Sequence, residues 1–237
     1  MLSGLNSETL LAFILAFSVS SFGFIFYHLF TNASALKRLE KRTDDNVRSV
    51  LVQRLSGVFI FGIPSLGIVH FIFKSDFSSF GTTCPELSTF LWILALSAII
   101  IPLNYFNSKT PENLSQYPQI RNSEWSVSLL VLSALSWIAY LLAYEFLFRG
   151  FLLFSSVALL GIWPAIFINT GIYSLVHIPK GSKETLGAIP FGIFLSYLAI
   201  QTGSFWIAFF AHVVLALSNE WFSLAAHKGM HLNLSRK

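Results

Sequence analysis

Residues 132–159 read LSALSWIAYLLAYEFLFRGFLLFSSVAL, and this stretch decides the fold class. Glu145 and Arg149 are its only charged residues. A helix needs roughly 20 apolar residues to cross a bilayer, and a helix in the core of a soluble protein does not need a run of this length. The stretch therefore predicts a membrane-spanning helix that carries two ionisable groups inside the lipid.

The remainder of the chain has the same character. Of its 237 residues, 54% are hydrophobic and 11% are charged, whereas a soluble domain averages about 25% charged residues. Long apolar runs recur along the whole sequence. We therefore predict an all-α, polytopic transmembrane helical bundle of about seven spans, at residues 10–30, 57–73, 90–106, 132–159, 162–178, 186–202 and 205–225.

The basic residues support this count, because with seven spans nearly all of them fall on one side. Lysine and arginine accumulate in short cytoplasmic loops, so the topology is predicted as N-out and C-in. Lys74 lies on the opposite side and Arg149 inside a span. The 13 residues on the predicted cytoplasmic side are Lys37, Arg38, Lys41, Arg42, Arg48, Arg54, Lys109, Arg121, Lys180, Lys183, Lys228, Arg236 and Lys237.

The sequence predicts one integrated membrane domain, since neither an internal repeat nor a flexible linker interrupts it. Residues 1–124 hold the first three spans, and residues 125–237 hold the polar site. Cys84 is the only cysteine, which excludes intramolecular disulfides and multi-thiolate metal sites. The basic residues lie in short loops, so we expect the lipid bilayer as a partner and no nucleic acid. A bacterial plasma membrane is the default location, with an endoplasmic-reticulum membrane as the alternative.

Several ionisable side chains lie inside predicted spans of the C-terminal half. Such residues are costly in lipid and are functional candidates for that reason. Glu145 and Arg149 are four residues apart with the glutamate first, the favourable order for an ion pair on a helix. A salt bridge that shares one desolvation cost is the structural alternative for Arg149.

Helix geometry places Glu145 and His177 at the same depth. The fourth and fifth spans form a hairpin that turns near Gly161; Glu145 lies 16 residues before this glycine and His177 lies 16 residues after it. At 1.5 Å per residue, both lie roughly 24 Å from the turn. We expect them to face each other, and a glutamate beside a histidine in a water-poor site can activate water as a general base.

The last span adds a second histidine. His212 lies nearer the membrane centre and is expected to donate a hydrogen bond to an oxyanion formed beside the Glu145–His177 pair. Asn219 follows seven residues later and returns to the same helix face. Glu220 is interpreted either as a supporting partner of the site or as a residue at the lipid–water boundary.

These residues resemble a known family. Glu145-Phe-Leu-Phe-Arg149-Gly, then Tyr173-Ser-Leu-Val-His177, then His212 in a last apolar helix are similar to the three motifs EExxxR, FxxxH and HxxxN/D of the CAAX-processing and bacteriocin-processing (CPBP or Abi) intramembrane proteases. The resemblance covers about residues 132–225. It implies a glutamic-type endopeptidase that acts near the cytoplasmic face, without a metal cofactor, on a peptide or protein substrate in the membrane.

Two positions depart from the family pattern. Tyr144 stands where the family has its first, water-activating glutamate, and Ala216 stands where Asn or Asp should follow His212. Asn219 or Glu220 could supply the missing polar group one turn further on. The sequence therefore leaves two alternatives: an active peptidase that uses Glu145, His177 and His212, and a catalytically degenerate member that acts as a membrane scaffold or immunity-type protein.

Two other chemistries stay open at this point. Glu145, His177 and His212 form a reasonable His₂Glu ligand set for zinc, which is the less favoured alternative because the resemblance implies no metal. A small transporter could also use buried charges as an ion path. The inverted repeats expected of many transporters are not visible.

Overall fold

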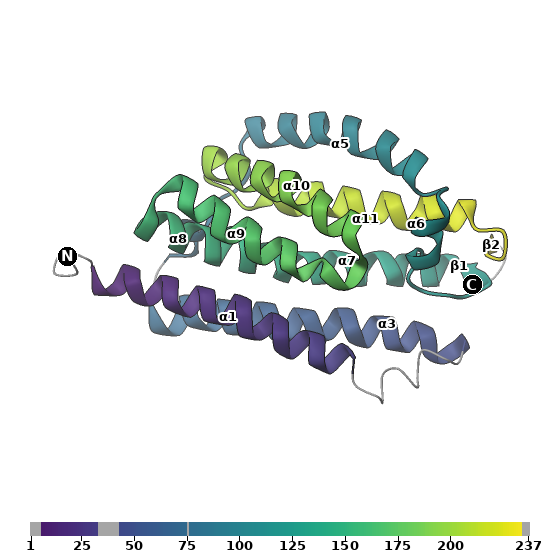
Figure 1. The fold of residues 1–237 in the computed structure, drawn as a ribbon, viewed down its shortest axis with the longest axis horizontal. Coiled ribbons are helices and arrows are strands. Elements are labelled where there is room, and N and C mark those ends of the chain that lie inside the picture. The colour runs from purple at the N-terminus through teal and green to yellow at the C-terminus, as the bar shows by residue number, and fades with distance from the viewer. Residues whose placement is uncertain (1–5, 33–42, 75, 234–237) are drawn as a thin grey trace.

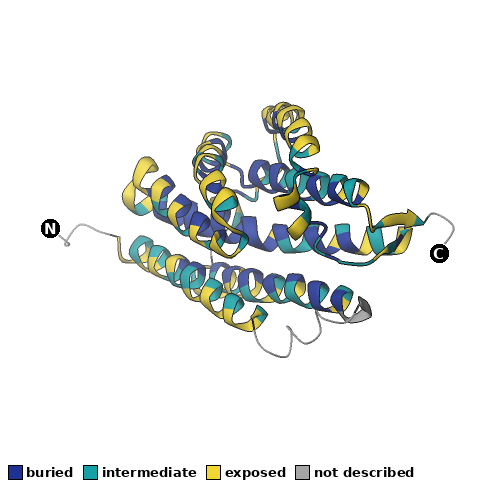
Figure 2. Ribbon diagram, turned by 45° about the vertical axis from the view of Figure 1, so that its right-hand side comes forward, coloured by how far each residue is buried: buried dark blue, intermediate teal, exposed yellow. Residues whose placement is uncertain are grey.

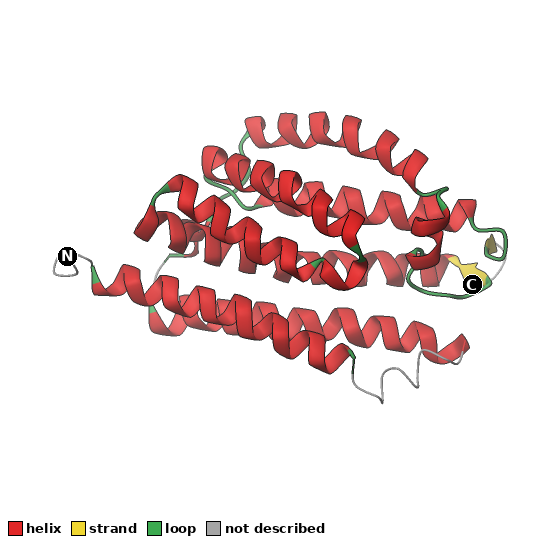
Figure 3. Cartoon of the chain, in the orientation of Figure 1, coloured by secondary structure: helices red, strands yellow, loops and turns green. Residues whose placement is uncertain are grey.

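The structure is a computed structural model that describes residues 6–32, 43–74 and 76–233, and it is almost entirely helical (Figures 1 and 3). This confirms the predicted all-α polytopic bundle. Among the described residues, six helices are long and apolar enough to cross a membrane. They are α1 (Ser7–Thr31), a helix from Asn46 to Ile72, α5 (Leu87–Asn107), a helix from Val127 to Leu160, α10 (Ser182–Thr202) and α11 (Trp206–Ala226).

Two of these long helices are made of several segments, and shorter elements connect the rest. The second long helix consists of α3 (Thr43–Gly57), η1 (Val58–Gly62), α4 (Ile63–Gly67) and η2 (Ile68–Ile72). The fourth consists of α7 (Val127–Glu145), η4 (Phe146–Leu152) and α8 (Leu153–Leu160). The shorter elements are η3 (Phe77–Phe80), α6 (Pro111–Gln116), β1 (Glu124–Ser126), α9 (Ile162–Val176), η5 (Ile178–Lys180) and β2 (His231–Asn233).

The fifth predicted span corresponds to the shorter helix α9. Its 15 residues extend about 22 Å, less than the roughly 30 Å thickness of a hydrocarbon core. The count of seven spans and the N-out, C-in orientation therefore remain predictions. Some basic residues that support the orientation lie outside the described residues: Lys37, Arg38, Lys41, Arg42, Arg236 and Lys237.

The helices differ in how far they are buried, as Figure 2 shows. In α11, 61% of the 18-residue apolar stretch that could cross a membrane is buried inside the protein, and in α1 the share is 11%. Helix α11 is therefore central and α1 peripheral. On α1, large apolar side chains such as Phe22, Phe26 and Leu29 are exposed. Exposed apolar side chains along whole helices suit lipid rather than water. Elements from both predicted parts of the chain pack together, with α5 against α11 and α3 against α7.

The polar site lies where the fourth long helix changes its geometry. The segment η4 is π-helical and begins directly after Glu145. A π-helical turn widens the helix locally, and such segments occur frequently at functional sites. All seven residues of η4, including Arg149, are buried. At its far end the helix stops at Gly161, whose φ of 81° permits the hairpin turn into α9.

The two short strands connect the ends of the C-terminal half. β1 precedes α7 and pairs in parallel with β2, which follows α11; Trp125 is opposite Leu232. Trp125 is fully buried. This pairing ties the start of α7 to the end of α11, the two helices that provide Glu145 and His212.

Candidate functional site

Glu145 is the centre of a buried polar group. Its side chain is completely buried at the end of α7, and its Oε1 atom lies 2.6 Å from Nδ1 of His212 on α11. Its Oε2 atom lies 3.2 Å from Nη1 of Arg149. A carboxylate only accepts hydrogen bonds, so Nδ1 of His212 carries the proton and donates it. Glu145 thus holds the His212 ring and forms an ion pair with Arg149.

Arg149 is also completely buried and lies one turn after Glu145, as the sequence predicts. Its guanidinium carbon lies 3.9 Å from the centre of the Tyr173 ring. A cation over an aromatic face is favourable, and more so when both are desolvated. Arg149 therefore compensates the charge of Glu145 and contacts α9 at the same time.

His177 follows the last residue of α9 and is fixed through its own helix. Its Nδ1 atom lies 2.8 Å from the carbonyl oxygen of Tyr173. A carbonyl can only accept, so Nδ1 is the protonated nitrogen, and in the neutral ring Nε2 is left with a lone pair. His177 therefore offers a hydrogen-bond acceptor to its surroundings.

The expected contact between Glu145 and His177 is not what the structure shows. The hydrogen-bonded and ion-paired partners of Glu145 are His212 and Arg149. Counting residues from Gly161 gives the depth of a side chain in the hairpin, but it does not give the direction in which that side chain points from its helix. Glu145 points toward α11, while His177 lines the cavities described next.

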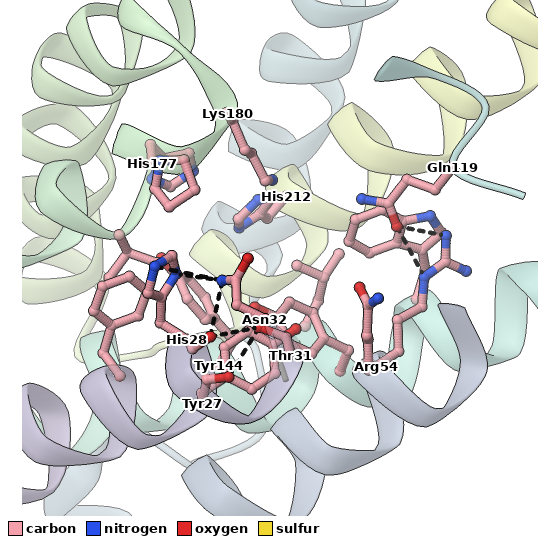
Figure 4. Close-up of a pocket in the computed structure, with 17 residues that line it drawn as sticks. Tyr27, His28, Thr31, Asn32, Arg54, Gln119, Tyr144, His177, Lys180 and His212 are labelled. Atoms are coloured by element: carbon pink, nitrogen blue, oxygen red, sulfur yellow. Dashed lines mark hydrogen bonds between the residues drawn. The ribbon is translucent and has the colours of Figure 1, made fainter. Parts of the chain in front are cut away.

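Two cavities meet at the histidines. The first has a volume of about 260 Å³ and opens among α1, α3 and the loop after α9 (Figure 4). The second has a volume of about 290 Å³ and lies among α5, α10 and α11. Glu145 is not part of either wall. The residues that line both cavities are Trp137, His177, Lys180 and His212.

Tyr144 takes the place beside the histidines that Glu145 was expected to occupy. It lines the first cavity together with His177 and His212. Its ring lies edge-on to the His212 ring, with 5.8 Å between the ring centres. The side chain is 2% exposed, and within residues 6–32, 43–74 and 76–233 its hydroxyl has no hydrogen-bond partner. Of the two neighbours Tyr144 and Glu145, Tyr144 is therefore the one that lines the cavity.

Asn219 and Glu220 lie in different surroundings despite being neighbours. Asn219 is buried and lines the second cavity, and its Oδ1 atom has no hydrogen-bond partner in the described part of the chain. Glu220 instead forms an ion pair with Arg54, in which Nη2 of Arg54 lies 3.3 Å from Oε1 of Glu220. Ala216 lines the second cavity as well and offers no polar group. Of the two proposed substitutes for the missing polar residue, Asn219 is the one that shares a cavity with His212.

The environment of Arg54 differs from the one expected from the sequence. It was assigned to a cytoplasmic loop, but it lies near the end of α3 and is 3% exposed. Besides Glu220, it donates to the side chain of Ser136 at 2.9 Å and to Gln119 at 3.1 Å. Its guanidinium carbon also lies 4.2 Å from the Trp137 ring centre. Arg54 therefore joins α3, α7 and α11.

Lys180 was interpreted as a plain loop residue, and the structure places it on the wall of both cavities. Its Nζ atom lies 3.8 Å from a carboxylate oxygen of Glu184. Burial opposes the charge of Lys180, but Tyr117 and Glu184 favour it more strongly, and they keep the pKa of Lys180 above its usual value. The mouth of the site therefore carries a positive charge.

Glu145, His177 and His212, the three residues of the zinc alternative, do not form one cluster of ligands in the described structure. Among the residues that the structure describes, no three His, Cys, Asp or Glu side chains lie close enough together to hold one metal ion. Glu145 and His212 share a hydrogen bond, and His177 is bonded to its own helix. Binding of all three side chains to one zinc ion at about 2.0–2.2 Å would require these contacts to change.

Comparison with known proteins finds a family match within the C-terminal half. Residues 125–218 match the family model described as type II CAAX prenyl endopeptidase Rce1-like. This match confirms the family resemblance over that segment, which includes Tyr144, Glu145, His177 and His212 and ends just before Asn219. No curated protein sequence and no solved structure matches the chain.

Proposed function

From the membership of residues 125–218 in a family of intramembrane CAAX-type proteases, we propose that this chain is an intramembrane endopeptidase of the CAAX-processing type. It hydrolyses a peptide bond of a membrane-bound peptide or protein, close to the cytoplasmic face. The observation that carries the proposal is the 2.6 Å hydrogen bond from His212 to the buried Glu145, because the same His212 lines a cavity together with His177. No metal takes part.

The roles follow from the hydrogen bonds. Glu145 fixes His212 by accepting from its Nδ1 atom, which leaves Nε2 as the general base for a water molecule. The charge of Glu145 stabilises the imidazolium that forms, in the manner of the carboxylate in a serine-protease triad. His177 accepts the second hydrogen of the same water through Nε2 and so orients it. His212 then passes its proton to the departing amine.

The substrate class comes from the matched family and from the position of the site. The family description names prenyl endopeptidases that act on CAAX sequences, and a prenyl chain would lie in the bilayer beside the first cavity. Lys180 at the cavity mouth suits a peptide that ends in a carboxylate. On sequence grounds we place the chain in a bacterial plasma membrane, with an endoplasmic-reticulum membrane as the alternative.

The test uses the full chain reconstituted in lipid nanodiscs with a farnesylated peptide that ends in a CAAX sequence. Mass spectrometry should detect release of the three C-terminal residues by the wild type and a loss of at least about 10²-fold for His212→Ala. His70→Ala is the matched control, because His70 is an exposed membrane-helix histidine away from both cavities. Activity that survives His212→Ala and His177→Ala would overturn the proposal, and insensitivity to chelators would support the metal-free mechanism.

The position of Tyr144 favours a second candidate function. At the sequence position where the family has a glutamate, this chain has Tyr144, which lines the first cavity, and Glu145 is turned away from that cavity. A catalytically degenerate member would keep the fold as a membrane scaffold or immunity-type protein. It would cleave no peptide, and His177→Ala and His212→Ala would leave its cellular phenotype unchanged as long as the variants fold.

A further inference from the structure

Tyr144 carries an unsatisfied donor on the wall of the first cavity. Its side chain is 2% exposed, and its hydroxyl has no hydrogen-bond partner among the residues that the structure describes. Buried polar groups in proteins are nearly always paired, so an unpaired buried hydroxyl needs an explanation. A ligand in the cavity that accepts a hydrogen bond would supply one.

The surroundings of Tyr144 hold its ring in place. The ring lies 4.7 Å from Phe148 and 5.8 Å from Tyr140, measured between ring centres. His212 lies edge-on to the same ring at 5.8 Å. A hydroxyl on a ring packed in this way is fixed before any substrate arrives. Such pre-organisation is what makes a donor effective at a reaction centre.

The proposed reaction lacks one component, which is a donor for the oxyanion. When water adds to a peptide carbonyl, the oxygen gains negative charge and needs hydrogen-bond donors about 2.7–3.1 Å away. His212 is engaged as the base, His177 presents an acceptor, and Ala216 has no polar group. Asn219 lines the second cavity and not the first, so a donor inside the first cavity has to come from another residue on its wall.

Other donors on this wall are less suited. Arg54 is occupied by Glu220, Gln119 and the serines of α7. The indole nitrogen of Trp137, like the Tyr144 hydroxyl, is buried and has no partner among the described residues, but the Trp137 ring packs against Arg54. Lys180 is about one third exposed and pairs with Glu184. Tyr144 alone of these is both unpartnered and packed against His212.

On the basis of the proposed function, we propose that the Tyr144 hydroxyl donates the hydrogen bond that stabilises the oxyanion of the tetrahedral intermediate. Water oxygen bonds to the carbonyl carbon, one water proton moves to Nε2 of His212, and the carbonyl oxygen becomes the oxyanion held by Tyr144. The C–N bond then breaks, the oxyanion returns to a carbonyl, and the proton on His212 moves to the amine. Tyr144 keeps its proton throughout. The tyrosine at the glutamate position is thus a change of catalytic role.

The first test compares Tyr144→Phe with the wild type on the farnesylated peptide. This change removes one oxygen and keeps the ring packing, so the variant should fold. Loss of one oxyanion donor lowers kcat by about 10²–10³-fold in other hydrolases, and we expect such a loss in kcat with KM changed less than about threefold. Tyr140→Phe is the matched control on the preceding helical turn, because its hydroxyl interacts with Tyr27. A Tyr144→Phe variant that keeps half or more of the wild-type kcat overturns the proposal. A loss of kcat in Trp137→Phe but not in Tyr144→Phe overturns it as well.

The second test does not depend on turnover and so separates this proposal from the proposed function. A peptide with a phosphinate in place of the scissile amide carries the tetrahedral oxyanion permanently. Calorimetry in nanodiscs should show that it binds the wild type at least about 10²-fold more tightly than Tyr144→Phe. The uncleaved amide peptide should bind both equally at 4 °C. Equal phosphinate affinities overturn the role of Tyr144, whereas a wild type that binds the phosphinate but cleaves no peptide contradicts only the proposed function.

Discussion

His212 donates from Nδ1 to Oε1 of Glu145 over 2.6 Å, and this hydrogen bond joins the fourth long helix to α11 inside the bundle. The acceptor is completely buried, and Arg149 compensates its charge at 3.2 Å. A charged group without a partner would be expensive in this environment. The three side chains therefore form one unit, in which each change affects both stability and the state of the histidine.

Glu145→Gln tests this unit directly. The amide keeps the size of the side chain but leaves Arg149 as an uncompensated buried charge. Removing one member of a buried ion pair costs about 3–5 kcal/mol, so thermal unfolding in detergent should occur at a clearly lower temperature. Cleavage of the farnesylated peptide should also fall by about 10²-fold or more, because the imidazolium of His212 loses its counter-charge.

The double variant Glu145→Gln/Arg149→Met separates the two effects. Replacing both members of a buried ion pair by uncharged groups of similar volume is often neutral. We therefore expect its unfolding temperature to return toward the wild-type value while its activity stays low. If Glu145→Gln alone unfolds at the wild-type temperature, Glu145 and Arg149 do not form the buried ion pair seen in the structure.

His177→Asn examines the role of the second histidine. Asparagine can place its amide nitrogen where Nδ1 of His177 lies and keep the hydrogen bond to the Tyr173 carbonyl. It has no group at the position of Nε2. The variant should therefore keep the wild-type unfolding temperature and lose cleavage by about 10²-fold or more. Full activity in His177→Asn would show that His177 supports the structure and does not orient water.

The sequence predicted the elements of the site better than their pairing. The long apolar runs predicted the helices. The ionisable residues inside these runs were predicted as site residues, and they are Glu145, Arg149, His177 and His212. Equal distance from Gly161 suggested that Glu145 faces His177, but direction around a helix depends on packing and on the π-helical turn after Glu145. This direction is also why Tyr144 lines the cavity and Glu145 does not.

Partners that are distant in sequence could not be predicted in the same way. Arg54 and Glu220 are separated by 166 residues and meet only because α3 and α11 both pack near α7. A sequence without aligned relatives carries no signal for such a pair. Lys180 is similar, since the loop after α9 brings it to both cavities only in the folded chain.

The ion pair between Arg54 and Glu220 should be a structural element rather than part of the reaction. Glu220 also accepts from the backbone nitrogen of Gln119 at 3.3 Å, so it ties α11 to the loop before β1. Glu220→Gln should lower stability by about 3 kcal/mol, measured by thermal unfolding in detergent. The KM and kcat of the folded fraction should change little. A large loss of kcat at unchanged stability would show that Glu220 takes part in the reaction.

The predicted orientation can be tested with the single cysteine. Cys84 is exposed and lies in the loop between the second and third long helices. The positive-inside rule places this loop outside the cell, because Lys74 is the only basic residue on its side. A membrane-impermeant maleimide added to intact cells should therefore label Cys84.

The control is a variant in which Cys84 is replaced by serine and Ser115 by cysteine. Ser115 is exposed in α6, on the predicted cytoplasmic side, so this variant should be labelled only after the membrane is opened. The reverse pattern would show that the chain has the opposite orientation and that the cavity mouth beside Lys180 faces outward.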